Sequence, residues 1–173
     1  MRLRDVRAGD VEAYVRMRCD PVMMAELGGP LPRERVEARL RKDLSLVAAD
    51  ASWIRMIVPD GAADDEAVGT VTLWSDQEDG VTVSEIGWMV LPGYQGRGLA
   101  KAAVRQVLDA AAEDGRWGEV HANPGAGNGP SNGICRALGF RLLGERDLDF
   151  ADRVLRTNHW VVVPGEHLGS GTD

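Results

Sequence analysis

The fold of this chain is decided by the stretch Met89-Val90-Leu91-Pro92-Gly93-Tyr94-Gln95-Gly96-Arg97-Gly98-Leu99-Ala100. An apolar strand ends in its first three residues, a Pro-Gly turn follows, and the rest leads directly into an amphipathic helix. Its last two glycines permit positive φ and let a ligand approach the backbone closely. A helix that begins here directs unpaired N–H groups and the positive end of its dipole at the turn. The stretch therefore predicts a site for an anion such as a pyrophosphate. The Arg97 side chain either contacts this anion or points to solvent.

Two other phosphate-binding motifs do not match these residues. Gly93 and Gly98 have the spacing of the Walker A motif, but Leu99-Ala100 stands where that motif requires Lys-Ser/Thr. Gly96 and Gly98 begin the dinucleotide fingerprint, but Lys101 replaces its third glycine. The stretch also follows antiparallel-looking strands and not an opening βαβ unit. Both nucleotide-binding motifs are excluded.

Hydrophobic periodicity on either side of this stretch predicts the remaining elements. Helices are expected to open at Asp10, to begin at Pro32, and to cover Gly98–Asp114 and Ser131–Leu138. Strands are expected at Arg2–Arg7, Ser52–Val58, Ala67–Ser75, Thr82–Leu91, Glu119–Ala122, Phe140–Arg146 and Val154–Val163. This order predicts an α+β, or mixed α/β, fold with one central mixed, mostly antiparallel sheet flanked by about four helices.

Length and composition restrict the protein class. The 173 residues fit a single domain, expected over 1–163, with 164–173 as a flexible tail. A net charge of −7 argues against nucleic-acid binding, and no apolar run is long enough for a membrane span. Cys19 and Cys135 lie far apart and the histidines are scattered, so no metal site is expected. We expect no signal peptide at the N-terminus, and we expect a cytoplasmic protein.

Two motifs resemble those of one enzyme family. Gln95-Gly96-Arg97-Gly98-Leu99-Ala100 is similar to the Gln/Arg-x-x-Gly-x-Gly/Ala signature of the GNAT superfamily of acetyl-CoA-dependent N-acetyltransferases. Asn128-x-x-Ser131, followed by Leu138-Gly139-Phe140, resembles the downstream segment of that family, in which an Asn and a short helix contact the cofactor. Ile86-Gly87-Trp88-Met89-Val90 resembles the branch that includes ribosomal-protein N-terminal acetyltransferases and modifiers of antibiotics and small amines.

The resemblance implies how acetyl-CoA is held as a co-substrate. Backbone groups of Met89 and Leu91 would pair with the pantetheine arm as another strand would. The N–H groups from Gln95 to Ala100 would hold the pyrophosphate, and Asn128 would contact the pantetheine or phosphate region. The expected cofactor-binding residues are Met89, Val90, Leu91, Gln95, Gly96, Arg97, Gly98, Leu99, Ala100, Asn128 and Ser131.

Acetylation of an amine requires a base for the ammonium proton and a proton for the leaving thiolate. Glu85, in the middle of an apolar strand, is the candidate base; the alternative is a carboxylate paired with an arginine or reaching solvent. Cys135 stands where many family members have a tyrosine, seven residues after the Asn, and Ser131 lies one helical turn earlier. Either is a candidate acid, although Cys135 also fits a core position and Ser131 a helix cap. His121 faces either the amine or a structural partner.

The sequence thus predicts transfer of an acetyl group from acetyl-CoA to a primary amine by direct attack in a ternary complex. The acceptor could be a protein N-terminus, a small amine metabolite or an amine-bearing antibiotic. We expect the acceptor surface to include the two N-terminal helices and their Leu27–Pro32 connection. The alternative is a non-catalytic CoA-binding sensor or scaffold module. This alternative stays open because Cys135 replaces the tyrosine that many family members have. A homodimer is expected from analogy with other small domains of this kind.

Overall fold

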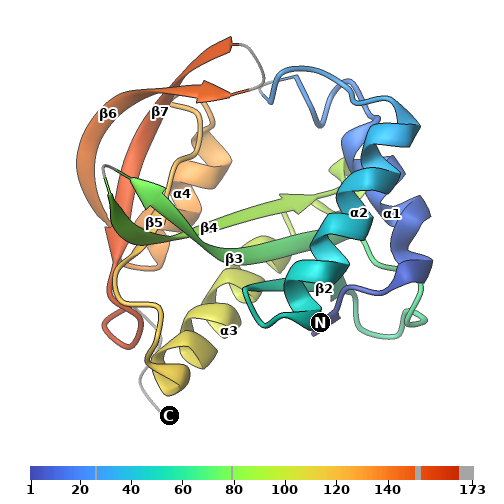
Figure 1. Ribbon diagram of the computed structural model, residues 1–173, viewed down its shortest axis with the longest axis horizontal. Helices are drawn as coiled ribbons and strands as arrows, with labels where there is room; N and C mark the ends of the chain where they lie inside the picture. Colours follow the sequence, from blue (N-terminus) through green and yellow to red (C-terminus); the bar gives the residue numbers. More distant parts are fainter. Residues whose placement is uncertain (26, 79, 151–152, 168–173) are drawn as a thin grey trace. The chain divides into compact units, whose positions relative to one another are not determined.

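Seven strands form one sheet in the order β1-β2-β3-β4-β5-β7-β6 (Figure 1). The computed structural model describes residues 1–25, 27–78, 80–150 and 153–167. The strands are β1 (Arg2–Asp5), β2 (Ser52–Val58), β3 (Gly69–Glu78), β4 (Val81–Val90), β5 (Val120–Ala122), β6 (Arg141–Phe150) and β7 (Arg153–Val162). The α-helices of the described residues are α1 (Val11–Arg18), α2 (Arg33–Ala48), α3 (Leu99–Asp114) and α4 (Gly129–Ala137), with short 3-10 helices η1 (Ala8–Asp10) and η2 (Pro92–Tyr94).

The sheet is mixed, because β4 pairs with β5 in parallel whereas β1 with β2, β5 with β7, and β6 with β7 are antiparallel. The predicted α+β fold, with a mixed sheet and about four helices, is confirmed. Chain contacts divide the molecule into two compact units, residues 1–72 with 88–100, and residues 73–87 with 101–173. The expectation of a single domain over 1–163 stays a prediction.

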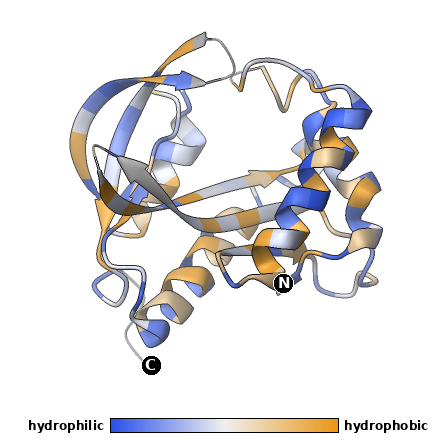
Figure 2. Ribbon diagram, in the orientation of Figure 1, coloured by the Kyte–Doolittle hydropathy of each residue, from blue (hydrophilic) through white to orange (hydrophobic). Residues whose placement is uncertain are grey.

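The first unit has its core between α1, α2 and β2. Tyr14 and Met17 of α1 and Val36 of α2 are fully buried, as are Met56 and Val58 of β2. These residues belong to one apolar cluster. Figure 2 shows α2 in hydrophilic and hydrophobic bands, as its heptad-like spacing of apolar residues predicts. The cluster fixes α1 and α2 side by side (Figure 1).

The second unit has its core around α3, β5 and β7. One face of α3 is buried through Ala103, Val104, Val107, Leu108 and Ala111, at the spacing the sequence predicts. All three residues of β5 pair with β7, since Val120 is opposite Val162 and Ala122 is opposite Trp160. β6 and β7 form a long antiparallel pair with a register shift between Leu142 and Gly144.

Several boundaries differ from the prediction for local reasons. α4 begins at Gly129, two residues before the predicted start, because the Asn128 side chain caps the helix. β6 continues to Phe150, four residues beyond the predicted end, along its partner β7. In the predicted tail, residues 168–173 lie outside the described residues. His167 is buried, and its Nε2 lies 3.1 Å from Oδ1 of Asp109 on α3.

Two further features concern only the described ranges. Within them, no helix combines the length and apolar character needed to cross a membrane. In the same ranges, no three or more His, Cys, Asp or Glu side chains gather in a way that would hold a metal ion.

Candidate active site

The turn that precedes α3 is braced by two of its own side chains. Gln95 Nε2 donates a hydrogen bond to the carbonyl of Val90 at 2.9 Å. Arg97 Nη2 donates to the carbonyl of Gly93 at 2.9 Å, and the guanidinium carbon lies over the Tyr94 ring, 5.2 Å from its centroid. The side chains at 95 and 97 therefore hold the shape of the turn, and its backbone is left to face a ligand.

The predicted anion site lies at the start of α3. Gly96 and Gly98 have φ values of 72° and 76°, in the left-handed region that glycine favours. A Cβ built at either glycine would meet no atom within 4 Å. No described residue accepts a hydrogen bond from the N–H groups of residues 96–100, whereas Gln95 N–H donates to the Pro92 carbonyl at 3.2 Å. The N–H groups without an acceptor among the described residues are thus those of 96–100, and Gln95 drops out of the set that was predicted to hold the pyrophosphate.

The end of β4 carries the residues predicted to contact pantetheine. Leu91 N–H donates to the Val68 carbonyl at 2.8 Å, and the Leu91 carbonyl accepts from Tyr94 N–H at 2.9 Å. Both Leu91 backbone groups are therefore occupied within the protein. Because N–H groups alternate in direction along a strand, the N–H of Val90 points to the edge opposite that of Leu91 and Met89. This register favours Val90 over its two neighbours for backbone contact with pantetheine.

The second predicted motif lies at the start of α4, in the second unit, whereas Met89–Ala100 belongs to the first. Asn128 Oδ1 accepts a hydrogen bond from Ser131 N–H at 3.1 Å, which makes Asn128 the N-cap of the helix. Ser131 is partly exposed. The Asn-x-x-Ser spacing therefore has a structural role as a helix cap, and the roles of both residues in cofactor binding stay predictions.

Asn132, which the sequence analysis does not single out, ties this motif to β7. The side chain is 2% exposed. Its Nδ2 donates to the carbonyls of Gly125 and Asn128 at 2.9 and 2.8 Å. Its Oδ1 accepts from Asn158 Nδ2 and from Trp160 Nε1, each at 2.8 Å. Asn132 thereby positions the loop that carries Asn128. A polar residue inside the apolar face of a short helix is the sequence signal for it.

Cys135, the candidate acid, is completely buried. Burial raises the pKa of its thiol to about 12, because the charged thiolate is poorly solvated there. At neutral pH the group therefore keeps its proton and is a weak donor. Its assignment as an acid stays a prediction, and Ser131 on the same helix is the more accessible of the two.

The two cysteines should differ sharply in reactivity. In the native protein at about pH 8, a thiol reagent should modify Cys19, which is partly exposed, and leave Cys135 unmodified, because reaction requires a thiolate and access. Cys135 should react after unfolding in denaturant. Peptide mapping after alkylation tests this directly. Rapid labelling of Cys135 in the folded chain would show that its environment is more open than the structure has it.

Glu85, the candidate base, has a histidine opposite it on the neighbouring strand. The register of β4 and β5 places Glu85 opposite His121. His121 Nδ1 lies 2.7 Å from Nε2 of His159 on β7, and the rings stack at 4.9 Å. Ring nitrogens this close form a hydrogen bond, in which one nitrogen donates and the other accepts. The structure thus places Glu85 opposite one member of a hydrogen-bonded histidine pair; the sequence contains both histidines but not their pairing.

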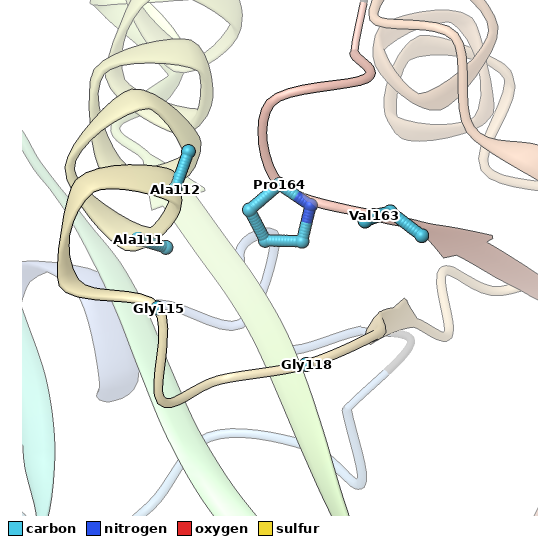
Figure 3. Close-up of a pocket in the computed structure, with 6 residues that line it drawn as sticks. All are labelled: Ala111, Ala112, Gly115, Gly118, Val163 and Pro164. Carbon is cyan, nitrogen blue, oxygen red and sulfur yellow. The ribbon is translucent and has the colours of Figure 1, made fainter.

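A small pocket of about 120 Å³ also lies in the second unit (Figure 3). It is lined by Ala111, Ala112, Gly115, Gly118, Val163 and Pro164. In Figure 3 the Pro164 ring points toward the C-terminal end of α3, which is the opposite end of this helix from the anion site. Its lining has no titratable side chain, so the pocket has no part in proton transfer.

Comparisons with known proteins agree with these features. The family described as "Acetyltransferase (GNAT) domain" matches residues 1–141. Among solved structures, ribosomal-protein-S5-alanine acetyltransferase from Vibrio fischeri is 17% identical, with 95% of this chain and 93% of that chain covered and a TM-score of 0.76. RimJ from Mycobacterium smegmatis, in complex with CoA-disulfide, is 21% identical, with 95% and 82% covered and a TM-score of 0.77.

A third structure, the putative acetyltransferase yncA from Salmonella typhimurium with acetyl-CoA, is 18% identical, with 99% and 98% covered and a TM-score of 0.74. At these identities the structural likeness shows the fold, and the family match spans most of the chain. The chain belongs to the GNAT family of acetyltransferases.

Proposed function

We propose that this enzyme transfers an acetyl group from acetyl-CoA to a primary amine by direct attack, without an acyl-enzyme. The observation that carries the proposal is the run of unpartnered N–H groups over residues 96–100 at the N-terminus of α3. Open space at Gly96 and Gly98 leaves room for a pyrophosphate against this backbone. The residues present therefore fit acetyl-CoA, whose thioester supplies the activated acetyl group.

The proposed roles in proton transfer follow from the side chains of the second unit. Glu85, with the His121–His159 pair beside it, accepts the proton of the acceptor ammonium. The neutral amine nitrogen then attacks the thioester carbonyl carbon, and a C–N bond forms as the C–S bond breaks. Ser131 relays a proton to the thiolate that leaves: its hydroxyl gives a proton to the sulfur as it takes up the proton that the attacking nitrogen loses, and Cys135 stays the alternative donor. A thiolate is a stable leaving group, so we expect the acid to contribute less than the base.

The acceptor is proposed at the level of its chemistry. One protein with this fold is named a ribosomal-protein-S5-alanine acetyltransferase, and another is described as an acetyl transferase that modifies the N-terminal serine of ribosomal protein L7/L12. These names support an N-terminal amine as the acceptor, with small amine metabolites and antibiotics as the other members of the class. We also propose a cytoplasmic location, in keeping with such acceptors.

Thiol release from acetyl-CoA in the presence of a panel of primary amines tests the proposed function. The panel should include peptides with free N-termini, polyamines, amino acids and aminoglycosides, each compared with an acetyl-CoA blank. We expect steady thiol release with at least one class. Tight acetyl-CoA binding with no release above the blank for any amine would instead favour a CoA-binding sensor.

Glu85→Gln should lower kcat/KM by about 100-fold, because an amide cannot accept the ammonium proton. In the wild type, kcat/KM should rise with pH through the pKa of the base, which is about 4.3 for an ordinary glutamate and about 6.5 for an ordinary histidine. His159→Gln, which breaks the histidine pair, should change this profile without the full loss. An active Glu85→Gln variant with an unaltered pH profile would remove Glu85 from the mechanism.

A further inference from the structure

Arg18, the last residue of α1, carries a buried positive charge that the mechanism does not use. Its Nη1 lies 2.9 Å from Sδ of Met89, a thioether, which is a weak acceptor. Its guanidinium carbon lies 5.1 Å from the centre of the Tyr14 ring. Its Nε is buried and has no hydrogen-bond partner among the described residues. A guanidinium keeps its charge in a protein, so this environment leaves a cation without a strong acceptor.

The carboxylate that interacts electrostatically with Arg18 already has other hydrogen-bond partners. Asp43, on α2, is 1% exposed. Its Oδ2 accepts from the Tyr14 hydroxyl at 2.9 Å, and its Oδ1 accepts from Arg39 Nε at 2.7 Å. Arg18 forms no salt bridge with a described residue, and burial lowers the pKa of its guanidinium. Asp43 thus interacts electrostatically with two arginines but forms its salt bridge with Arg39, and the charge of Arg18, beside Met89, has no salt bridge with a described residue.

Such a charge is destabilising in a buried place unless an anion balances it. Arg18 as a whole is partly exposed, and because its Nε is buried, a ligand would have to reach the terminal nitrogens of the guanidinium. Arg18 also lies where the acceptor surface is predicted. Its carbonyl accepts a hydrogen bond from Leu31 N–H at 2.8 Å, which ties the end of α1 to the connection before α2. All of these residues belong to the first unit.

We propose that Arg18 binds a carboxylate of the acceptor, so that the preferred substrate is an amine that also carries a carboxylate group. This inference rests on the proposed function and names the substrate class of the same enzyme. A planar guanidinium binds a carboxylate through paired, charge-assisted hydrogen bonds. An uncharged amide in place of the carboxylate cannot form such bonds. The carboxylate belongs either to a free amino acid or to an acidic side chain near a peptide N-terminus.

Calorimetric titration in the presence of CoA tests the inference without requiring turnover. Matched pairs differ only in the carboxylate: an amino acid against its amide, and a peptide beginning Ala-Asp against one beginning Ala-Asn. We expect the wild type to bind the carboxylate member of one pair at least about tenfold more tightly. The pair that shows the preference identifies the source of the carboxylate.

Arg18→Gln should abolish this preference and leave CoA affinity unchanged, while Arg18→Lys should keep part of it. Arg16→Gln is the matched control, because it removes the same charge from an exposed position of the same helix. Equal affinity within both pairs in the wild type would overturn the inference, whether or not the variants fold. So would a preference that survives in Arg18→Gln. If the preference depends on Arg18 but no amine is acetylated, the inference stands and the proposed function fails.

Discussion

Gly98→Val will raise the dissociation constant for acetyl-CoA by about 100-fold, since it removes charge-assisted hydrogen bonds from the backbone to the pyrophosphate. The effect should come from the ligand and not from the fold. A Cβ at Gly98 meets no protein atom within 4 Å, so the valine side chain would fill the space in which we place the anion. Calorimetric titration with acetyl-CoA measures the change.

Gly61→Val is the matched control for this prediction. Gly61 has the same φ of 76° and the same open space around an added Cβ, but it lies in the turn between β2 and β3. The two valines therefore introduce a similar backbone strain, of about 1–2 kcal/mol. Gly61→Val should keep its affinity for acetyl-CoA. Equal losses in both variants would assign the effect to strain, and no loss in Gly98→Val would refute the placement of the pyrophosphate.

Asn132→Ala should lower the free energy of unfolding by about 3 kcal/mol, the largest stability effect we expect from a single side chain outside the apolar core. The substitution leaves the buried Trp160 Nε1 and the Asn158 amide without their acceptor, and two loop carbonyls without their donor. For a chain of this size the loss corresponds to a fall in Tm of about 10 °C. Thermal and urea unfolding measure it.

Asn128→Ala provides the comparison for Asn132. It removes one capping hydrogen bond, to Ser131 N–H, and should lower the free energy of unfolding by about 1 kcal/mol. Asn132→Asp, which keeps the acceptor oxygens but loses the amide donors, should fall between the two. An Asn132→Ala variant as stable as Asn128→Ala would mean that the network contributes no more than the cap.

The geometry of the turn before α3 could be predicted because its information is local. Gly96 and Gly98 reveal the positive φ, and the amphipathic pattern that follows marks the start of α3. What the pattern does not contain is the strand register. The register determines that the backbone N–H and carbonyl of Leu91 have partners within the protein, whereas the N–H of Val90 points to the opposite edge of the strand. A shift of one residue would reverse the direction of each of these groups.

The other features missed in the sequence depend on partners far apart in the chain. Asn132 and Trp160 are 28 positions apart, His121 and His159 are 38 apart, and the Arg18 contact with Met89 spans 71. A single sequence gives residue types but not such pairings. For this reason His121 could be proposed from its strand, whereas its partner and the buried charge of Arg18 required the structure.

Product analysis tests the central claim most directly. The enzyme is incubated with acetyl-CoA and the best acceptor of the amine panel, and both products are quantified by mass spectrometry. We predict equal amounts of acetylated amine and free CoA, formation of both at the wild-type level in Gly61→Val, and about tenfold less of both in Gly98→Val at an acetyl-CoA concentration about ten times the wild-type dissociation constant. Binding of acetyl-CoA by the wild type without acetylation of any amine would contradict the account.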